Sequence, residues 1–206
     1  LNYADHAREA GIAPPAEPVL FMKAVSAICG PNDDTIRPRD SNRLDHEVEL
    51  GVVIGTRASY VEESRALDYV AGYCLANDIS ERGFQLERGG GQWDKGKGCD
   101  TFAPLGPWLV TRDEIADPQN LSLYLDVNGE RRQTGNTANM IFPVAHIVAY
   151  LSCFLTLMPG DVILTGTPPG VGLGMKPPRF LNPGDEVRLG IAGLGEQHQR
   201  IIAWPG

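Results

Sequence analysis

The second half of the chain is divided into short segments by recurrent turn signals. The apolar run LSLYLDV (121–127) is followed by Asn128-Gly129, and two Pro-Gly-Asp turns, at 159–161 and 183–185, each precede another apolar run. Asn-Gly favours the two-residue turn of a β-hairpin, and Pro-Gly pairs interrupt helices. The 24 glycines and 16 prolines of the 206 residues agree with frequent turns. We therefore expect a β-rich body whose strands lie within 121–127, 161–167, 185–191 and 197–204.

Helices are expected to be few. Residues 143–157 carry apolar side chains at helical spacing, begin with proline and are followed by Pro159-Gly160, which predicts a helix packed on the core. Residues 4–11 predict a shorter helix that ends at a glycine and places His6 and Glu9 on one face. The expected fold class is therefore mainly β with a few helices, in one domain over 1–206.

Composition narrows the class of partner. The net charge of -8 argues against nucleic acid and against an anionic membrane surface, both of which favour clustered lysine and arginine. No apolar run approaches the ~20 residues that span a bilayer. Leu1 is not a start methionine, so we expect the native chain to begin further upstream. The four cysteines have no metal-like or redox-like spacing, and we expect reduced, mostly buried thiols in a cytoplasmic protein: Cys29, Cys74, Cys99 and Cys153.

HEVELGVVIG (46–55) reads as a buried strand with two glutamates at its start. Glu47 and Glu49 share a face because strand side chains alternate, and two such charges near a core require a cation or a proton. A second apolar strand ends at Asp78. Three carboxylates suit Mg²⁺ or Mn²⁺ and would leave about three of six positions open. The alternative, favoured by the spacing alone, is an edge strand whose glutamates are solvated.

Cationic and amide side chains follow the second of these strands. Ser80 can cap a helix on which Arg82 and Gln85 share a face, and Lys97 stands between two glycines, where the backbone can approach a ligand closely. Taken singly, such cations are more often surface charges. Three carboxylates with a divalent ion sum to -1, and Arg82 and Lys97 bring the sum to +1, so the pocket would accept an anion.

Two glycine-rich stretches complete the pattern. RGGGQ (88–92) lacks the spacing of a phosphate-binding loop and is expected to be a turn or the hinge of a lid. LTGTPPGVGLG (164–174) predicts a strand that continues into a loop, where Thr167 offers a hydroxyl. Because the chain has no Gly-x-Ser-x-Gly elbow, a serine hydrolase is not indicated.

Taken together, these motifs resemble the fumarylacetoacetate hydrolase family over nearly the whole chain. The resemblance rests on the order and spacing of LNYADHAREAG, PVLFMK, LDHEVELGVVIG, NDISERGFQ, KGKGCDTFAPLGPW, VNGERRQTGNT, PGDVILTGTPPGVG and PGDEVRLGI. It is greatest for the bacterial branch named for ureidoglycolate lyase or 2,4-diketo-3-deoxy-L-rhamnonate hydrolase. The resemblance implies a mixed β-sandwich roll that is commonly a homodimer.

The resemblance also implies roles for particular residues. The implied ligands of Mg²⁺ or Mn²⁺ are Glu47, Glu49 and Asp78. The residues that would contact the substrate's carboxylate and oxo groups are Arg82, Gln85, Lys97 and Thr167. The implied catalytic residues are the water-activating pair on a mobile N-terminal segment and the lysine that stabilises an enolate: His6, Glu9 and Lys97. His46 stands where relatives often have an aromatic residue, and alternation turns it away from the ligand side.

The activity expected from this resemblance is metal-dependent hydrolysis of a carbon–carbon bond in a 2,4-dioxo acid, which yields pyruvate and a second acid. Oxaloacetate decarboxylation and ureidoglycolate lysis are alternatives on the same metal site. Outside the enzymes, a metal-dependent module that binds small acids is a further alternative. The sequence does not specify the acyl group, because loops rather than the scaffold determine selectivity.

Overall fold

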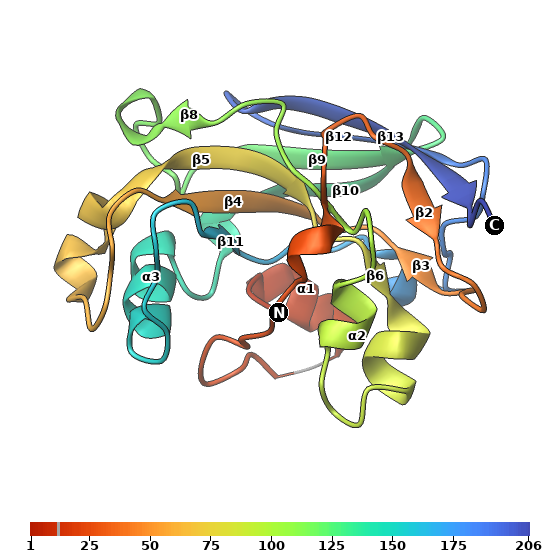
Figure 1. Cartoon of the computed structure of the whole chain (residues 1–206), viewed down its shortest axis with the longest axis horizontal. Helices are drawn as coiled ribbons and strands as arrows, with labels where there is room; N and C mark the ends of the chain where they lie inside the picture. The colour runs from red at the N-terminus through yellow and green to blue at the C-terminus, as the bar shows by residue number, and fades with distance from the viewer. Residues whose placement is uncertain (12) are drawn as a thin grey trace.

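Two β-sheets packed on each other form the body of the protein (Figure 1). The computed structural model describes residues 1–11 and 13–206. The five-stranded sheet has the order β10 (Glu130–Asn136), β9 (Ser122–Val127), β12 (Glu186–Ile191), β13 (Gly195–Ala203) and β2 (Thr35–Arg37). The four-stranded sheet has the order β11 (Val162–Leu164), β4 (Val48–Ile54), β5 (Val70–Asn77) and β8 (Val110–Thr111). Strand β13 pairs with β2 in parallel and with β12 in antiparallel orientation, so the sheet is mixed.

Shorter elements surround these sheets. Two small sheets pair β1 (Ile28–Cys29) with β7 (Ala103–Pro104), and β3 (Leu44–Asp45) with β6 (Ser80–Glu81). The α-helices are α1 (Ala4–Ala10), α2 (Asp94–Lys97) and α3 (Val144–Ser152). The remaining helical turns are η1 (Val25–Ala27), η2 (Glu63–Tyr69), the π-helix η3 (Gly83–Glu87), η4 (Arg112–Glu114), η5 (Thr137–Asn139) and η6 (Gly172–Gly174). Within residues 1–11 and 13–206, no helix has the length and apolar character required to cross a membrane.

The expected fold class is confirmed, and the predicted hairpin forms. Strands β9 and β10 pair in antiparallel orientation around Asn128 and Gly129, whose φ angles of 52° and 76° are those of a two-residue turn of the type that twisted hairpins favour. The strands expected in 161–167, 185–191 and 197–204 are present as β11, β12 and β13. The mixed β-sandwich is the architecture that the sequence predicted.

Two helix predictions were wrong in detail. Helix α3 ends at Ser152, so Leu155, which belongs to the predicted range 143–157, lies beyond the helix and is 38% exposed. Ser80 does not cap a helix: it pairs with Asp45 in the β3–β6 ladder, and its hydroxyl donates to the carbonyl of Asp78 (2.9 Å). The helical turn starts later, at Gly83. Pairing with a distant strand outweighed the local capping preference.

The cysteine prediction was also wrong in part. Within the described part of the chain all four cysteines are free, as expected. Only Cys74 among them is buried, however, and Cys153 is exposed just beyond the end of α3. An exposed thiol at a helix end does not follow the usual tendency of free cysteine to be buried.

Strand β4 carries core residues on one face, and Glu49 lies on the other face, with Glu47 directly before the strand. Its alternate residues Val48, Leu50, Val52 and Ile54 all belong to the buried core. Because β4 lies between β11 and β5, it is an interior strand, and the alternative of a solvated edge strand was wrong. Helices α1, α2 and α3 lie on the side of β4 and β5 that faces away from the five-stranded sheet (Figure 1). The acidic face of β4 is therefore covered by other parts of the chain.

Candidate active site

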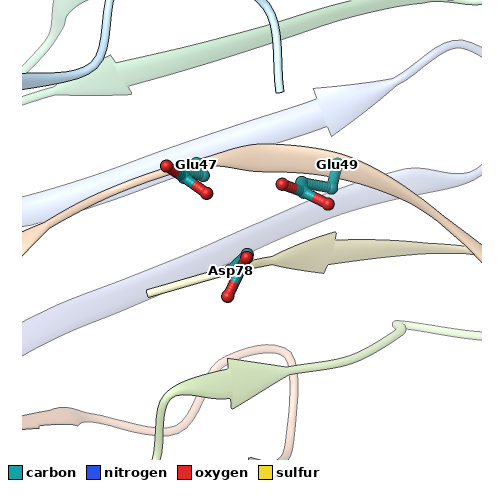
Figure 2. Close-up of side chains that lie close together, drawn as sticks. All are labelled: Glu47, Glu49 and Asp78. Atoms are coloured by element: carbon teal, nitrogen blue, oxygen red, sulfur yellow. The ribbon is translucent and has the colours of Figure 1, made fainter. Parts of the chain in front are cut away.

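Three carboxylates converge where β4 begins and β5 ends (Figure 2). One oxygen from each of Glu47, Glu49 and Asp78 lies within 4.8 Å of the other two. The antiparallel register accounts for this geometry: Val48 pairs with Asn77, and the amide of Asp78 donates to the carbonyl of Glu47 (2.8 Å). The residues are only 6%, 3% and 1% exposed, respectively. The structure thus brings together the three residues predicted as metal ligands.

The electrostatics of this triad differ between its glutamates. Burial raises the pKa of Glu49 well above its ordinary value, and the charges of Asp78 and Glu47 raise it further. Burial also disfavours the charge on Glu47, but Lys97 and Arg82 hold its pKa well below the ordinary value. A hard divalent ion would remove the repulsion that Glu49 experiences, and carboxylate oxygens are the ligands that Mg²⁺ and Mn²⁺ prefer. The residues present therefore fit the expected metal.

Lys97 lies between two of the carboxylates. Its Nζ is 2.7 Å from Glu47 Oε2 and 2.6 Å from Asp78 Oδ2, and the side chain is 2% exposed. A second ammonium, that of Lys23, is 2.6 Å from the other Asp78 oxygen. Sequence reasoning missed Lys23, because it lies 55 residues before Asp78 and no local pattern joins them. Both cations stabilise the buried negative charge.

The glycines on either side of Lys97 have a packing role. A Cβ on Gly96 would lie 2.5 Å from the backbone nitrogen of Gln85, and one on Gly98 would lie 3.2 Å from the backbone nitrogen of Ala24. We had interpreted these glycines as allowing a ligand to approach closely. In the structure they allow neighbouring chain segments to approach, which holds Lys97 against the triad.

Arg82 is fixed by partners on three sides. Its Nε donates to Asp45 Oδ2 (2.8 Å), its Nη2 to Glu47 Oε1 (2.6 Å) and its Nη1 to Gln85 Oε1 (3.0 Å). Arg82 and Gln85 therefore share a face, as predicted. Asp45, which is fully buried, was missed. A signal was present, because Asp45 is two residues before Glu47 and so continues the alternation of Glu47 and Glu49.

The charges of the site nearly cancel one another. When all are ionised, the triad and Asp45 carry four negative charges, and they face the three cations Arg82, Lys97 and Lys23, which leaves a local charge of -1. A divalent ion would change this local charge to +1. This is the value expected from the sequence, because the charges of Asp45 and Lys23, which the sequence analysis did not include, cancel. The site can therefore attract a small anion although the chain carries -8.

The predicted His6–Glu9 pair forms on α1. His6 Nδ1 is 3.1 Å from Glu9 Oε2, and the His6 side chain is 12% exposed. Both Glu9 oxygens accept from the amide of Gly170 (3.1 Å), in the loop that follows β11. His46 contacts the same residue, with Nε2 3.3 Å from the carbonyl of Gly170, and it is not one of the three residues that are placed to hold an ion. Gly170 thus contacts both histidine-bearing segments.

The loop after β11 also contacts the triad. The amide of Gly166 donates to Glu49 Oε2 (2.7 Å). The hydroxyl of Thr167 donates to the carbonyl of Val48 (2.8 Å) and accepts from Gln133 Nε2 (2.8 Å), so protein groups hold it on both sides. Its contact with substrate stays a prediction. Residues 88–92 form the expected turn, with positive φ at its second and third glycines, and their role as a lid hinge also stays a prediction.

Comparison with known proteins agrees with this fold and site. The chain belongs to the fumarylacetoacetate hydrolase family, since the family profile described as "Fumarylacetoacetate (FAA) hydrolase C-terminal" matches residues 1–202. Over 201 residues the chain is 66% identical to a protein of Burkholderia cenocepacia (strain HI2424) whose name specifies no substrate; the match covers 97% of this chain and 71% of the relative.

Two solved structures show the range of reactions named among relatives. The 5-carboxymethyl-2-hydroxymuconate delta-isomerase of Mycobacterium smegmatis has a TM-score of 0.87 and 40% identity, covering 100% of this chain and 77% of that chain. The fumarylpyruvate hydrolase of Pseudomonas aeruginosa, in complex with Mn²⁺ and pyruvate, has a TM-score of 0.88 and 34% identity, covering 98% and 87%. At the level of the family, these relatives and the buried triad support a metal-dependent activity of the acylpyruvate type.

Proposed function

We propose that the protein is a divalent-metal-dependent hydrolase that cleaves a carbon–carbon bond in a 2,4-dioxo acid and releases pyruvate and a second acid. The observation that carries this proposal is that the chain has two separate groups of residues suited to catalysis. One is a buried carboxylate triad flanked by cations, and the other is a histidine held by a glutamate on α1. A structural ion would require only the first of these.

The metal ligands in this proposal are Glu47, Glu49 and Asp78. A bound Mg²⁺ or Mn²⁺ would polarise the keto-acid end of the substrate and stabilise negative charge on departing pyruvate. Arg82 and Gln85, already joined by a hydrogen bond, would orient the substrate's carboxylate.

The proton transfers are assigned to the protein's own residues. His6 would accept a proton from water, and Glu9 would hold the imidazole in the required orientation. The water oxygen then bonds to the distal carbonyl carbon, and the bond to the pyruvate carbon breaks with its electron pair moving to the pyruvate enolate. Lys97 lies in the triad, where its ammonium would stabilise the enolate oxygen. The proton that His6 accepted from water then passes to the enolate carbon, which gives pyruvate and restores neutral His6.

Three other reactions could use the same residues. Oxaloacetate decarboxylation also passes through a pyruvate enolate but requires no attacking water, ureidoglycolate lysis eliminates urea, and the M. smegmatis relative is named as an isomerase. His6 distinguishes hydrolysis from decarboxylation, because only hydrolysis requires a base for water. We favour hydrolysis because His6 is held by Glu9, and Glu9 is itself held by Gly170.

The test is a substrate panel of 2,4-dioxo acids, oxaloacetate and ureidoglycolate, each assayed with Mg²⁺, with Mn²⁺ and without metal. We expect metal-dependent cleavage of the dioxo acids, and its loss in His6→Ala. The matched control is His146→Ala, because His146 pairs with Glu63 at 2.9 Å on an exposed surface. Dioxo acid cleavage at the full rate in His6→Ala would contradict the mechanism.

A binding module would give a different result. Oxalate resembles the pyruvate enolate and should bind the metal-loaded protein in a calorimetric titration. We expect this binding to disappear when the metal is removed by chelation. Oxalate binding that persists in the metal-free protein, with no turnover of any substrate in the panel, would favour a module for small acids over the enzyme.

A further inference from the structure

A cavity lies next to His46. Its volume is about 350 Å³, and it is lined by residues of β10, of the β9–β10 turn and of the segment 178–185. His46 lines the cavity, and its Nδ1 is 3.7 Å from Asp45 Oδ1. None of the triad residues lines the cavity. The cavity is therefore separate from the candidate metal site.

Arg132 enters this cavity because β10 contains a bulge. The register with β9 shifts between Arg131 and Gln133, so Arg132 is the extra residue of the strand. Bulges are common next to active sites, where they redirect a side chain. The Arg132 side chain is 6% exposed, and its Nη2 is 3.1 Å from Glu130 Oε2. The bulge thus places a buried guanidinium in the cavity wall.

The hydrogen-bonding capacity of this guanidinium is incomplete. Among the described residues, Arg132 Nε has no hydrogen-bond partner although it is buried, and the same holds for His46 Nδ1. Buried polar groups usually have partners, and an unpaired donor on a charged group is especially costly. Arg179 lines the same cavity, is half exposed, and is 2.9 Å from Glu130 Oε1. Two guanidiniums therefore face a cavity in which one buried N–H lacks an acceptor.

We propose that this cavity binds a small monocarboxylic acid whose carboxylate accepts from the half-exposed Arg179 guanidinium and, once the Arg132 side chain shifts towards the cavity, from its buried Nε. Planar carboxylates match guanidinium donors in geometry. A single negative charge fits better than a phosphate dianion, because Glu130 already neutralises part of the cationic charge and Asp185 also lines the cavity. Apolar wall residues, including Pro178 and Phe180, would contact a short alkyl chain.

The cavity is connected to the His6–Glu9 pair through one residue. The carbonyl of Gly170 lies 3.3 Å from His46 Nε2, and its amide donates to Glu9 (3.1 Å). Gly170 also packs on the Arg132 backbone so closely that a Cβ would lie 1.9 Å from the Arg132 carbonyl oxygen. A ligand that shifts His46 or Arg132 would thus move Gly170 and change the position of Glu9. This effect on catalysis rests on the proposed function, whereas binding in the cavity does not.

Butyrate is a suitable probe, because it carries one carboxylate and a short alkyl chain but no second oxygen group for chelating a metal. The experiment titrates butyrate into the Mg²⁺-loaded full chain and follows the ring resonances of all four histidines by NMR. We expect saturable shifts of His46 and of His6. The partly exposed ring of His146 and the exposed ring of His198 should not move. Saturable shifts confined to these two rings would overturn the site, and a shift of His46 without one of His6 would overturn the coupling.

Substitutions test the assigned donors. Arg132→Gln and Arg179→Gln should each weaken butyrate binding about tenfold, the loss expected for one charged hydrogen bond. Arg131→Gln is the matched control, since Arg131 is the neighbouring exposed arginine and pairs with Asp126 instead. Arg179 is half exposed, so its variant should fold even if Arg132→Gln does not.

The remaining outcomes decide between ligand classes. Butyrate affinity that is unchanged in Arg179→Gln and in folded Arg132→Gln would overturn the proposal. Tighter binding of inorganic phosphate than of butyrate would overturn the assignment to a carboxylate. Because these readouts are binding and chemical shift, they remain distinct from a failure of dioxo acid cleavage, which would contradict the proposed function alone.

Discussion

At the scale of single residues, the site depends on buried charges that hold one another in place. Burial would lower the pKa of Arg82, but Asp45 and Glu47 raise it above its ordinary value. Burial would likewise raise the pKa of Asp45, yet Arg82 keeps it below the ordinary value. Removal of one member of such a pair leaves an uncompensated buried charge.

Asp45→Asn should therefore be costly. The amide would keep the shape of the side chain but leave the Arg82 guanidinium with one carboxylate fewer, so we expect the free energy of unfolding to fall by about 3 kcal/mol. Urea denaturation measures this change. The control is Asp34→Asn, which removes the same kind of pair with Arg200 at an exposed position and should change stability little. Equal effects of the two substitutions would argue against a buried charge network.

The pH dependence of alkylation at Cys29 tests the environment of this thiol. Burial and the nearby charge of Asp33 raise the pKa of the Cys29 thiol to about 11. Only the thiolate reacts with iodoacetamide, so the rate of alkylation should rise about tenfold per pH unit between roughly pH 8 and pH 10. Mass spectrometry of single-site labelling measures the rate, with exposed Cys153 as the rapidly labelled reference. A rate at Cys29 that is already constant at pH 8 would contradict the raised pKa.

The residues of the site differed in how far the sequence could predict them. Glu47 and Glu49 were predictable because alternation along one strand is local information. Asp45 satisfies the same alternation and could have been included. Lys23 could not, because its contact with Asp78 depends on how distant segments pack. Spacing alone favoured a solvated edge for the glutamates, and only the position of β4 inside the sheet decided against it.

At the scale of elements, the loop after β11 connects the triad to the histidine-bearing segments. Its amides donate to Glu49 from Gly166, to Glu9 from Gly170 and to Asp45 from Gly172. The sequence predicted the strand and the loop, but not that the loop would contact all three groups. Capping and strand ends were also harder to predict, as Ser80 shows, because partners that are distant in the chain determine them.

Gly170→Ala tests this loop. Gly170 has a φ of 105°, and an added Cβ would lie 1.9 Å from the Arg132 carbonyl oxygen, so the loop must move. We expect a loss of several kcal/mol of stability or, if the loop yields, a large fall in dioxo acid cleavage as Glu9 is displaced. Thermal unfolding and steady-state kinetics measure the two effects.

Gly184→Ala is the matched control for this substitution. Gly184 has a φ of 98°, but no atom of residues 1–11 and 13–206 lies within 4 Å of the added Cβ, so its variant suffers only the backbone strain of about 1 kcal/mol. The difference between the two variants isolates the steric contact. If both variants have the same stability and activity, the close packing of the loop on β10 does not contribute to stability or activity.

At the scale of the whole molecule, the fold places a locally compensated site inside a chain of net charge -8. The two-sheet body was predictable, because turn signals and alternation are frequent in the sequence. The burial of the acidic face of the four-stranded sheet was not predictable. The segments that cover this face come from separate parts of the chain: α1, the loop after β11 and the segment around Lys23. The homodimer implied by the family resemblance stays a prediction that a molar mass measurement in solution would test.

Metal binding should stabilise the whole fold, since the triad joins β4 to the end of β5. At about 100 times the dissociation constant, an ion adds about 2.7 kcal/mol, which corresponds to a rise in Tm of roughly 5–10 °C for a chain of this size. Differential scanning calorimetry with Mn²⁺ or Mg²⁺ measures the shift against metal-free protein. An unchanged Tm at saturating metal would contradict the assignment of the triad as a metal site.

The substitution Glu49→Gln distinguishes the stabilising effect of a bound ion from the effect of the charge repulsion that the ion would relieve. The pKa of Glu49 is raised in the metal-free protein, which means that its negative charge destabilises the fold at neutral pH. The neutral amide should therefore leave the metal-free protein at least as stable as wild type, while the metal-induced rise in Tm disappears. Glu62→Gln, at an exposed position, should keep that rise in full. A metal-free Glu49→Gln protein that unfolds well below wild type would show that Glu49 stabilises the fold without an ion.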